Sequence, residues 1–284
     1  MDFENHALHR TWVAKTQGRY WGIADSDGNP LMDLPPALPG FEVPRTLNAT
    51  SSAQASFIIR SRRGHLHPVV ATLVDEKLGA ADSDGRLEPA LKGTFFLVHQ
   101  VGEYRQTFLI GSVALSGPSD GPNTMEIRAA NMTTLIDGIP LWSYPRSLRG
   151  RWRTVDQDFA GPWTKSYELQ NVFFGAQADG FTVTGPAEET IRTLMDETLA
   201  ATWRAIDYQG DPPVVVDPTP SGRQSPNIMI RPDDGFLWQT LAPIAAMSGV
   251  SIDSFMWWPG DSPVEGHQLT QPTVVITVEQ RTEE

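Results

Sequence analysis

Histidine is the side chain in this sequence whose type and spacing could hold a metal ion. The 284-residue chain has six His and no Cys, which excludes thiolate ligands and thiol nucleophiles. His65 and His67 would share one face of a strand, a spacing that lets two imidazoles bind one metal ion. No third ligand is evident nearby and Pro68 follows. The alternative interpretation is the exposed end of a strand.

The tetrapeptide Asp-Ser-Asp-Gly occurs twice, at residues 25–28 and 82–85. It resembles the start of a calcium loop, but an EF-hand places a third ligand before its Gly and a Glu at a fixed distance after it. In both copies the Gly comes too early. Asp-Gly turns explain the repeat more simply, and we assign no metal site to it.

The acidic residues and tryptophans are compatible with a carbohydrate-active module. Glycoside hydrolysis needs two carboxylates but no local motif, and the chain has 34 Asp and Glu together with nine Trp that would suit sugar stacking. No spacing singles out an acid and a nucleophile, and Walker, Gly-x-Gly-x-x-Gly, Gly-x-Ser-x-Gly and His-Glu-x-x-His motifs are lacking. We therefore expect no enzyme, name no catalytic residue and expect no cofactor.

Charge is distributed unevenly along the chain. The net charge is −12; residues 1–153 hold 16 basic and 15 acidic residues, whereas residues 154–284 hold 6 and 19. Proteins that grip phosphate backbones need a basic surface, so we expect no tight binding of nucleic acid. The acidic half is either a solvated surface or a wall that repels polyanions. Without an apolar run of about 20 residues or a signal-peptide pattern, we expect no membrane insertion.

Three parts of the chain differ in pattern. Residues 1–40 end in a Pro-rich stretch and predict an extended N-terminal arm. Residues 41–150 show the period of two that strands have, and predict an antiparallel β-barrel or sandwich domain. A short helix that Gly138 ends should follow the last strand of this domain. The strands expected in the domain of residues 41–150 are 56–60, 69–74, 94–100, 104–115 and 124–130.

Residues 151–284 predict a second domain of α+β type. Pro186 at a first helical position, followed by two Glu, starts the clearest helix. Asp233 and Asp234 can cap a second helix, which Pro243 should kink or shorten. The fold class is therefore mainly β with some α, an antiparallel barrel followed by an α+β barrel-like domain. The strands expected in this domain are 170–174, 214–216, 227–231, 251–257 and 272–279.

Aromatic and arginine residues gather between residues 139 and 175, a segment that we interpret as an irregular loop. The loop either covers the first barrel or forms a docking surface, since Arg and aromatic residues are enriched in interface cores. Four Arg fall within eight residues there, and the arm carries further aromatic residues. The candidate interface residues are Arg146, Arg149, Arg151, Arg153, Trp12 and Trp21.

The order of several features resembles a known family. Pro44–Ile59 leads into the first barrel, and Ile127–Ala130 meets Leu135–Trp142. A helix that opens with Gly185–Ile191 follows, and then Gly235–Ala242 precedes an apolar strand. This order resembles the minor tail proteins of long-tailed phages (siphoviruses) of actinobacteria, specifically the tail-hub class.

The resemblance covers roughly residues 40–260 and implies a structural virion protein, made in the host cytoplasm and located at the distal end of the phage tail. Hubs of this class are trimers with two barrel-like domains per subunit. The ring joins the tail tube to the tip, or baseplate, and lets the genome pass. The implied partners are further copies of this chain, the distal tail ring, tip proteins and the tape-measure protein.

Many hub proteins continue into a further C-terminal domain, whereas this chain ends soon after residue 278. We therefore expect a minimal hub, or a hub whose later parts are separate proteins. Two alternatives remain open beside the trimeric hub. The first is a distal tail protein, which forms a hexameric ring, and the second is a carbohydrate-binding or carbohydrate-hydrolysing virion module.

Overall fold

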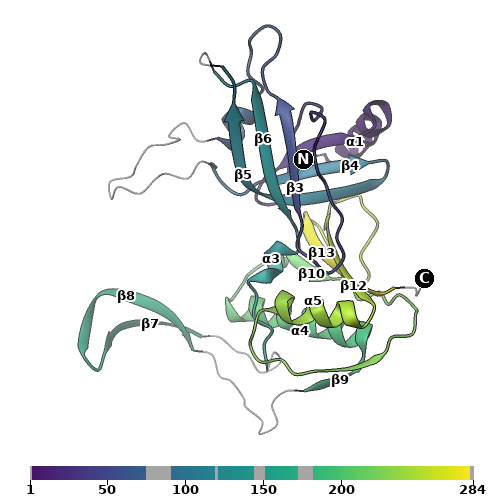
Figure 1. The fold of residues 1–284 in the computed structure, drawn as a ribbon. Coiled ribbons are helices and arrows are strands. Elements are labelled where there is room, and N and C mark those ends of the chain that lie inside the picture. The colour runs from purple at the N-terminus through teal and green to yellow at the C-terminus, as the bar shows by residue number, and fades with distance from the viewer. Residues whose placement is uncertain (1, 75–90, 119–120, 144–150, 172–181, 282–284) are drawn as a thin grey trace. The chain divides into compact units, whose positions relative to one another are not determined.

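The computed structural model describes residues 2–74, 91–118, 121–143, 151–171 and 182–281 (Figure 1). The described protein is mainly β, with antiparallel sheets and fewer helices, as the sequence predicts. It forms two compact units. Unit 1 consists of Met1–Thr134 and Ser254–Val274, and unit 2 of Leu135–Asp253 and Val275–Glu284. The first boundary thus lies 16 residues before the one expected at 150, and the chain re-enters unit 1 near its C-terminal end.

Six strands build the main sheet of unit 1. They are β1 (Tyr20–Ala24), β2 (Pro30–Asp33), β3 (Ser52–Ile58), β4 (Phe96–Val101), β5 (Tyr104–Ser116) and β6 (Thr124–Asn131). Their order is β2-β1-β4-β5-β6-β3, and every neighbouring pair is antiparallel. The chain beyond β2 crosses to the other edge, where Ala37 and Glu42 bridge Phe57 and Gln54 of β3. The two edges are thereby connected, as in a small barrel.

Alternating burial explains why these residues form strands. Along β3, Ala53, Ala55 and Phe57 are buried while Ser52 and Ile58 face outward. A period of two places alternate side chains on one face of a sheet. The inward faces of β1, β3, β4, β5 and β6 contribute to one apolar core. Each large side chain buried there stabilises the fold by roughly 1.5–3 kcal/mol.

The expected strands of this region are confirmed for β4, β5 and β6, and the expected short helix is α3 (Thr134–Asp137). The strand expected at 69–74 is wrong, because these residues form the helix α2 (Val69–Leu73). Val69 and Leu73 are both buried at helical i, i+4 spacing. A short β-branched run is compatible with either structure, and here packing against the core selected the helix.

The extended arm expected for residues 1–40 is also wrong. The segment folds into α1 (Phe3–Gln17) followed by β1 and β2. Asp2 caps the helix by accepting a hydrogen bond from the Asn5 N–H at 3.0 Å, and Gly18 ends it in the left-handed conformation at φ 82°. β1 then pairs with β4 over its whole length. The N-terminal residues are therefore an integral part of unit 1.

His99 of β4 lies inside an aromatic cluster of this core. Its ring centroid is 4.3 Å from that of Trp21 and 6.4 Å from that of Phe41. The side chain is buried, and its Nε2 has no hydrogen-bond partner among the described residues. Burial, with a contribution from the charge of Arg19, lowers the pKa of His99 to about 4. Protonation would place an unpaired positive charge in the core.

We expect unit 1 to lose stability in mild acid because of this histidine. The unfolded chain takes up the proton near pH 6.5, whereas the folded protein takes it up near pH 4. Stability therefore falls between these two values, by about 2 kcal/mol at pH 5 relative to neutral pH. The variant His99→Phe should show a correspondingly flatter pH dependence in urea unfolding. Parallel pH profiles for the variant and the wild type would contradict this assignment.

Unit 2 combines two helices with short sheets. Its elements beyond residue 181 are β9 (Val183–Pro186), α4 (Ala187–Ala205), β10 (Val214–Val216), β11 (Asn227–Ile230) and α5 (Leu237–Met247), together with β12 (Val250–Trp257) and β13 (Thr273–Gln280), which cross the boundary with unit 1. One sheet has the order β10-β13-β12, and β9 pairs with β11 in antiparallel fashion. Helices α4 and α5 pack against each other (Figure 1). Both helices confirm the sequence prediction, as do β10, β11, β12 and β13 within one residue at each end.

The expected aspartate cap of α5 is wrong. Phe236 occupies the N-cap position and provides no side-chain cap. The Asp234 carboxylate instead accepts hydrogen bonds from the N–H of Ser143 at 2.7 Å and from its hydroxyl at 3.0 Å. Pro243 lies inside the helix, which continues to Met247. The Pro therefore does not end the helix.

Residues 254–274 carry the chain out of unit 2 and back again, and Trp258 anchors them in unit 1. The Trp258 side chain is only 2% exposed. Its indole N–H donates to the Gly28 carbonyl at 2.8 Å, while the guanidinium groups of Arg10 and Arg105 lie 4.6 and 4.3 Å from the ring centre. Arg105 also pairs with Asp261. This Trp258 anchor joins the segment to α1 and β5.

Candidate functional site

A long β-hairpin is the most unusual surface feature of the described residues. It consists of β7 (Arg151–Asp158) and β8 (Gly161–Asn171), which pair in antiparallel fashion. Asp158 shapes the turn by accepting a hydrogen bond from the Ala160 N–H at 2.8 Å, and Gly161 follows at φ 125°. We call residues 151–171 the interface hairpin.

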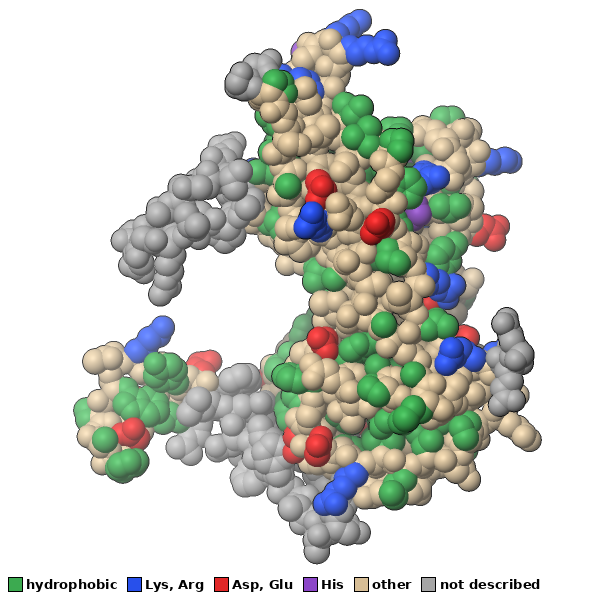
Figure 2. Space-filling model, viewed as in Figure 1, with side chains coloured by type: hydrophobic (Ala, Val, Ile, Leu, Met, Phe, Trp, Pro, Cys, Tyr) green, Lys and Arg blue, Asp and Glu red, His purple; other side chains and the backbone are tan. Residues whose placement is uncertain are grey.

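The interface hairpin leaves its apolar side chains uncovered. None of the side chains between residues 154 and 168 is buried, and Phe159 at the turn is fully exposed. Trp163 and Tyr167 contact each other edge to face at 5.4 Å. Hydrophobic side chains gather on the visible face of the hairpin (Figure 2).

Apart from their pairing with each other, β7 and β8 make no extensive contact with another described helix or strand. A two-stranded hairpin on its own is at best marginally stable in water, and exposed apolar patches mark interaction surfaces. The interface hairpin is therefore a candidate docking element.

The sequence predicts an irregular aromatic loop for this region, whereas the structure has a hairpin there. The signal was present in β8, where Trp163, Tyr167 and Leu169 fall at alternate positions that only Lys165 interrupts, and polar residues lie between them. Such alternation has the period of a strand. The strand expected at residues 170–174 lies mostly outside the described residues, although Gln170 and Asn171 end β8.

The six candidate interface residues have different positions. Arg146 and Arg149 lie outside the described residues. Arg151 and Arg153 fall in β7, at the base of the hairpin, where the description covers the backbone alone. Trp12 is exposed on α1, with 60% of its surface accessible.

For Trp21 the expectation of an interface position is wrong. It is 3% exposed and packs edge to face on Phe41 and Phe57 in the core of unit 1, so it has no surface with which to meet a partner. The cause is its place in β1, a strand that the arm interpretation did not include.

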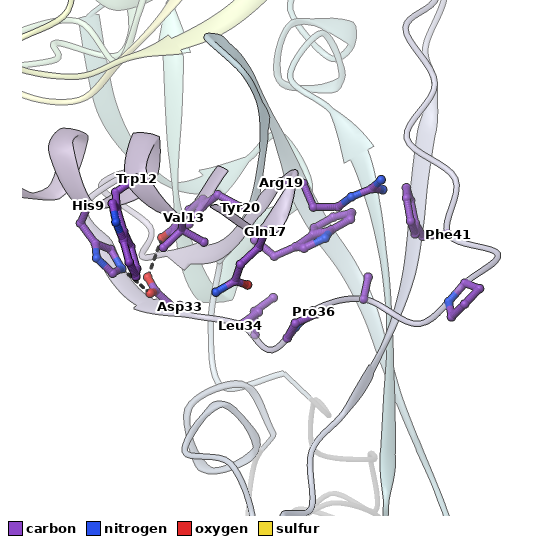
Figure 3. Close-up of a pocket in the computed structure, with 13 residues that line it drawn as sticks. His9, Trp12, Val13, Gln17, Arg19, Tyr20, Asp33, Leu34, Pro36 and Phe41 are labelled. Carbon is purple, nitrogen blue, oxygen red and sulfur yellow. Dashed lines mark hydrogen bonds and ion pairs between the residues drawn. The ribbon is translucent and has the colours of Figure 1, made fainter. Parts of the chain in front are cut away.

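A groove in unit 1 begins beside Trp12 (Figure 3). The Trp12 ring stacks on the ring of His9, with an interplanar angle of 29° and a centroid distance of 6.4 Å. His9 is held by Asp33 at 2.6 Å, and Asp33 accepts a second hydrogen bond from the Tyr20 hydroxyl at 2.9 Å. The Asp33 carboxylate thus accepts both bonds and holds the His9 ring, on which the Trp12 ring stacks.

The groove continues from Trp12 toward Phe41, and it encloses a volume of about 830 Å³. The Arg19 guanidinium lies over the Phe41 ring at 4.4 Å. The exposed side chain of Gln17 lines the same groove. Pro36 and Pro39 form part of the opposite wall. Aromatic faces and polar groups thus line one surface.

The described residues do not bring together three His, Asp or Glu side chains that could hold a metal ion. His65 is exposed and His67 half-buried in the turn that follows β3. In the first Asp-Ser-Asp-Gly copy, the Asp25 carboxylate accepts hydrogen bonds from the N–H groups of Asp27 and Asn29, and Gly28 has φ 81°. The turn interpretation is confirmed for this copy, and the second copy at 82–85 lies outside the described residues.

Comparison of the sequence with models of known families and with curated proteins gave no match. Among the helices of the described ranges, none is long and apolar enough to span a membrane. Inferences about function therefore rest on the sequence pattern and on the two surfaces described above, the interface hairpin and the groove.

Proposed function

We propose that this protein is a structural subunit of a phage tail tip, which assembles with further copies of itself into a hub ring that joins the tail tube to the tip. The observation that carries the proposal is the interface hairpin, whose exposed aromatic side chains need a partner surface. The order of sequence features from about residue 40 to 260, which resembles tail-hub proteins, supports the same conclusion.

A projecting hairpin suits assembly into a ring. A cyclic ring of three or more subunits uses a heterologous interface, in which one patch of each copy binds a different patch of the next. Aromatic residues supply most of the binding free energy in such interfaces. The eight residues of β7 give the hairpin a reach of roughly 26 Å, enough to extend well into a neighbouring subunit.

The acidic charge of residues 154–284 supports a place beside a DNA channel. Those residues hold 19 acidic and 6 basic side chains. A channel that passes DNA must not bind it, and a negative wall repels phosphate. In the proposed ring this half of the chain contributes the wall of the channel.

Removing the aromatic side chains of the hairpin should abolish assembly without unfolding the protein. In the double variant Phe159→Ser and Tyr167→Ser, both changes are at exposed positions, so circular dichroism should be unchanged. If each aromatic residue contributes about 2 kcal/mol to the interface, assembly weakens by roughly 30-fold per residue. Sedimentation velocity at high protein concentration and negative-stain class averages sorted by symmetry measure the result.

Met247→Ser is the matched control, because Met247 is another strongly exposed apolar residue of unit 2. It should assemble as the wild type does. Threefold rings of the wild type support the hub, and sixfold rings instead favour a distal tail protein. A wild type that stays monomeric, or a double variant that assembles normally, contradicts the proposal.

A further inference from the structure

The groove of unit 1 has the chemistry of a sugar-binding site. One face of a pyranose ring carries C–H groups that pack on an aromatic ring, while its hydroxyls need hydrogen-bond partners at the edge. Ligand sites in general combine aromatic walls with a few placed polar groups. In this groove the Trp12 ring supplies an open aromatic face, and Gln17 and Arg19 lie along the same surface (Figure 3).

We propose that this groove binds a pyranose unit of a polysaccharide, with Trp12 as the stacking platform. Trp12 is 60% exposed, whereas the other tryptophans whose side chains the structure describes are half-buried or buried. What distinguishes Trp12 from other exposed apolar residues is its place at the mouth of a groove that polar side chains also line. The face of Trp12 opposite His9 is the surface on which the sugar packs.

The platform is held in place before any ligand arrives. His9 lies against one face of the Trp12 ring and is bonded to Asp33, which in turn accepts the Tyr20 hydroxyl. Tyr20 is buried in β1, so this chain of contacts ends in the core. The contact with His9 restricts the Trp12 ring on one face, which lowers the side-chain entropy that binding would cost.

The polar groups further along the groove serve the sugar hydroxyls. The Gln17 amide, which has an acceptor and two donors, is exposed along the groove. The Arg19 guanidinium packs over Phe41 and keeps its N–H donors at the edge of the groove. The volume of about 830 Å³ accommodates more than one sugar ring.

A proline-rich peptide fits this groove less well. Recognition of a polyproline helix uses a groove lined by several aromatic rings. Here Tyr20 and Trp21 are buried and Phe41 is covered by Arg19, so Trp12 alone offers an open ring face. The His9–Asp33 pair and the exposed Gln17 amide supply polar groups that a proline helix would leave unused.

Saturation-transfer NMR on the full-length protein tests the site, with chitohexaose, maltohexaose and mannohexaose as probes. We expect transfer from the wild type to at least one probe at a Kd of about 1 mM. Trp12→Ala should weaken that binding at least tenfold, and Gln17→Ala by roughly threefold. Leu8→Ala is the matched control, because Leu8 is equally exposed one turn earlier on α1 but does not line the groove.

Three results would overturn the inference. They are no transfer to any of the three probes, binding that Trp12→Ala leaves unchanged, and Trp12-dependent binding of a decaproline peptide with no sugar response. The readout does not depend on ring assembly, so failure here and failure of the proposed function are distinguishable. If the protein binds a sugar but stays monomeric, the sugar site is supported and only the proposed hub function is contradicted.

Discussion

Replacing Trp258 with alanine is expected to lower the free energy of unfolding of unit 1 by about 3–5 kcal/mol. The change removes the largest fully buried side chain of the described residues, and with it the hydrogen bond to the Gly28 carbonyl. It also removes the aromatic ring over which the guanidinium groups of Arg10 and Arg105 both lie. Burial and the nearby charge of Arg105 already lower the pKa of Arg10 to about 10.

Two measurements test whether Trp258 anchors the segment 254–274. Urea unfolding gives the free energy, and hydrogen exchange followed by mass spectrometry should show faster exchange in peptides from residues 254–274. Trp258→Phe keeps most of the packing and loses the hydrogen bond, so it should fall between alanine and the wild type. Trp12→Ala, at an exposed position, should change stability by less than about 0.5 kcal/mol. Equal stability of Trp258→Ala and Trp12→Ala would refute the anchor.

Replacing Glu188 with alanine is expected to destabilise unit 2 by about 3–5 kcal/mol. The buried Glu188 carboxylate accepts hydrogen bonds from the N–H and the hydroxyl of Ser221, from the Gln280 N–H at 3.2 Å and from Arg192. It therefore ties the first turn of α4 to the loop before β11 and to the end of β13. Removing the Glu188 carboxylate leaves the Arg192 charge without its ionic partner, in a site that is nearly closed to water.

Glu188 should also shape the acid stability of unit 2. Burial alone would raise the pKa of Glu188, but the hydrogen bonds from Ser221, Arg192 and Gln280 outweigh it and hold the pKa below its ordinary value. The stabilisation is therefore present above the unfolded pKa of about 4.3 and is lost as the pH falls through the lower folded pKa. Acid titration of Glu188→Gln should lack this last step.

Glu189→Ala is the control, since Glu189 occupies the same first turn, with the same relation to the helix dipole, but is exposed. Its loss should change the free energy of unfolding by less than about 1 kcal/mol. Comparable losses for the two variants would show that charge at the helix end, and not the buried hydrogen bonds, carries the effect.

Patterns with a single structural solution were predictable from the sequence. The alternating runs of β4, β5 and β6 lie within about two residues of their expected bounds, and the amphipathic helix α4 begins within two residues of its expected start. The failures have physical causes. Helix α1 lacks a continuous apolar face and is marked only by its caps, Asp2 and Gly18. α2 shows that a β-branched run adopts the structure that buries its ends.

The candidate surfaces were less predictable than the fold. Trp12 and Trp21 look alike in the sequence, yet one is exposed on a helix and the other is buried in a strand. Their difference depends on the pairing of β1 with β4, a contact between segments about 80 residues apart. The groove likewise depends on the tertiary fold, because it unites the end of α1 with the Pro-rich segment after β2. Neither local pattern nor composition encodes such contacts.

The excursion of residues 254–274 into unit 1 has a consequence for the evolution of this chain. Unit 1 is discontinuous in the gene, because unit 2 is largely inserted between its two pieces. A single crossover near residue 134 would exchange unit 2 but would also replace Trp258 and Asp261, which are matched to Arg10, Gly28 and Arg105. Recombination between relatives should therefore preserve the two units as one inherited block, or exchange unit 2 only through paired crossovers.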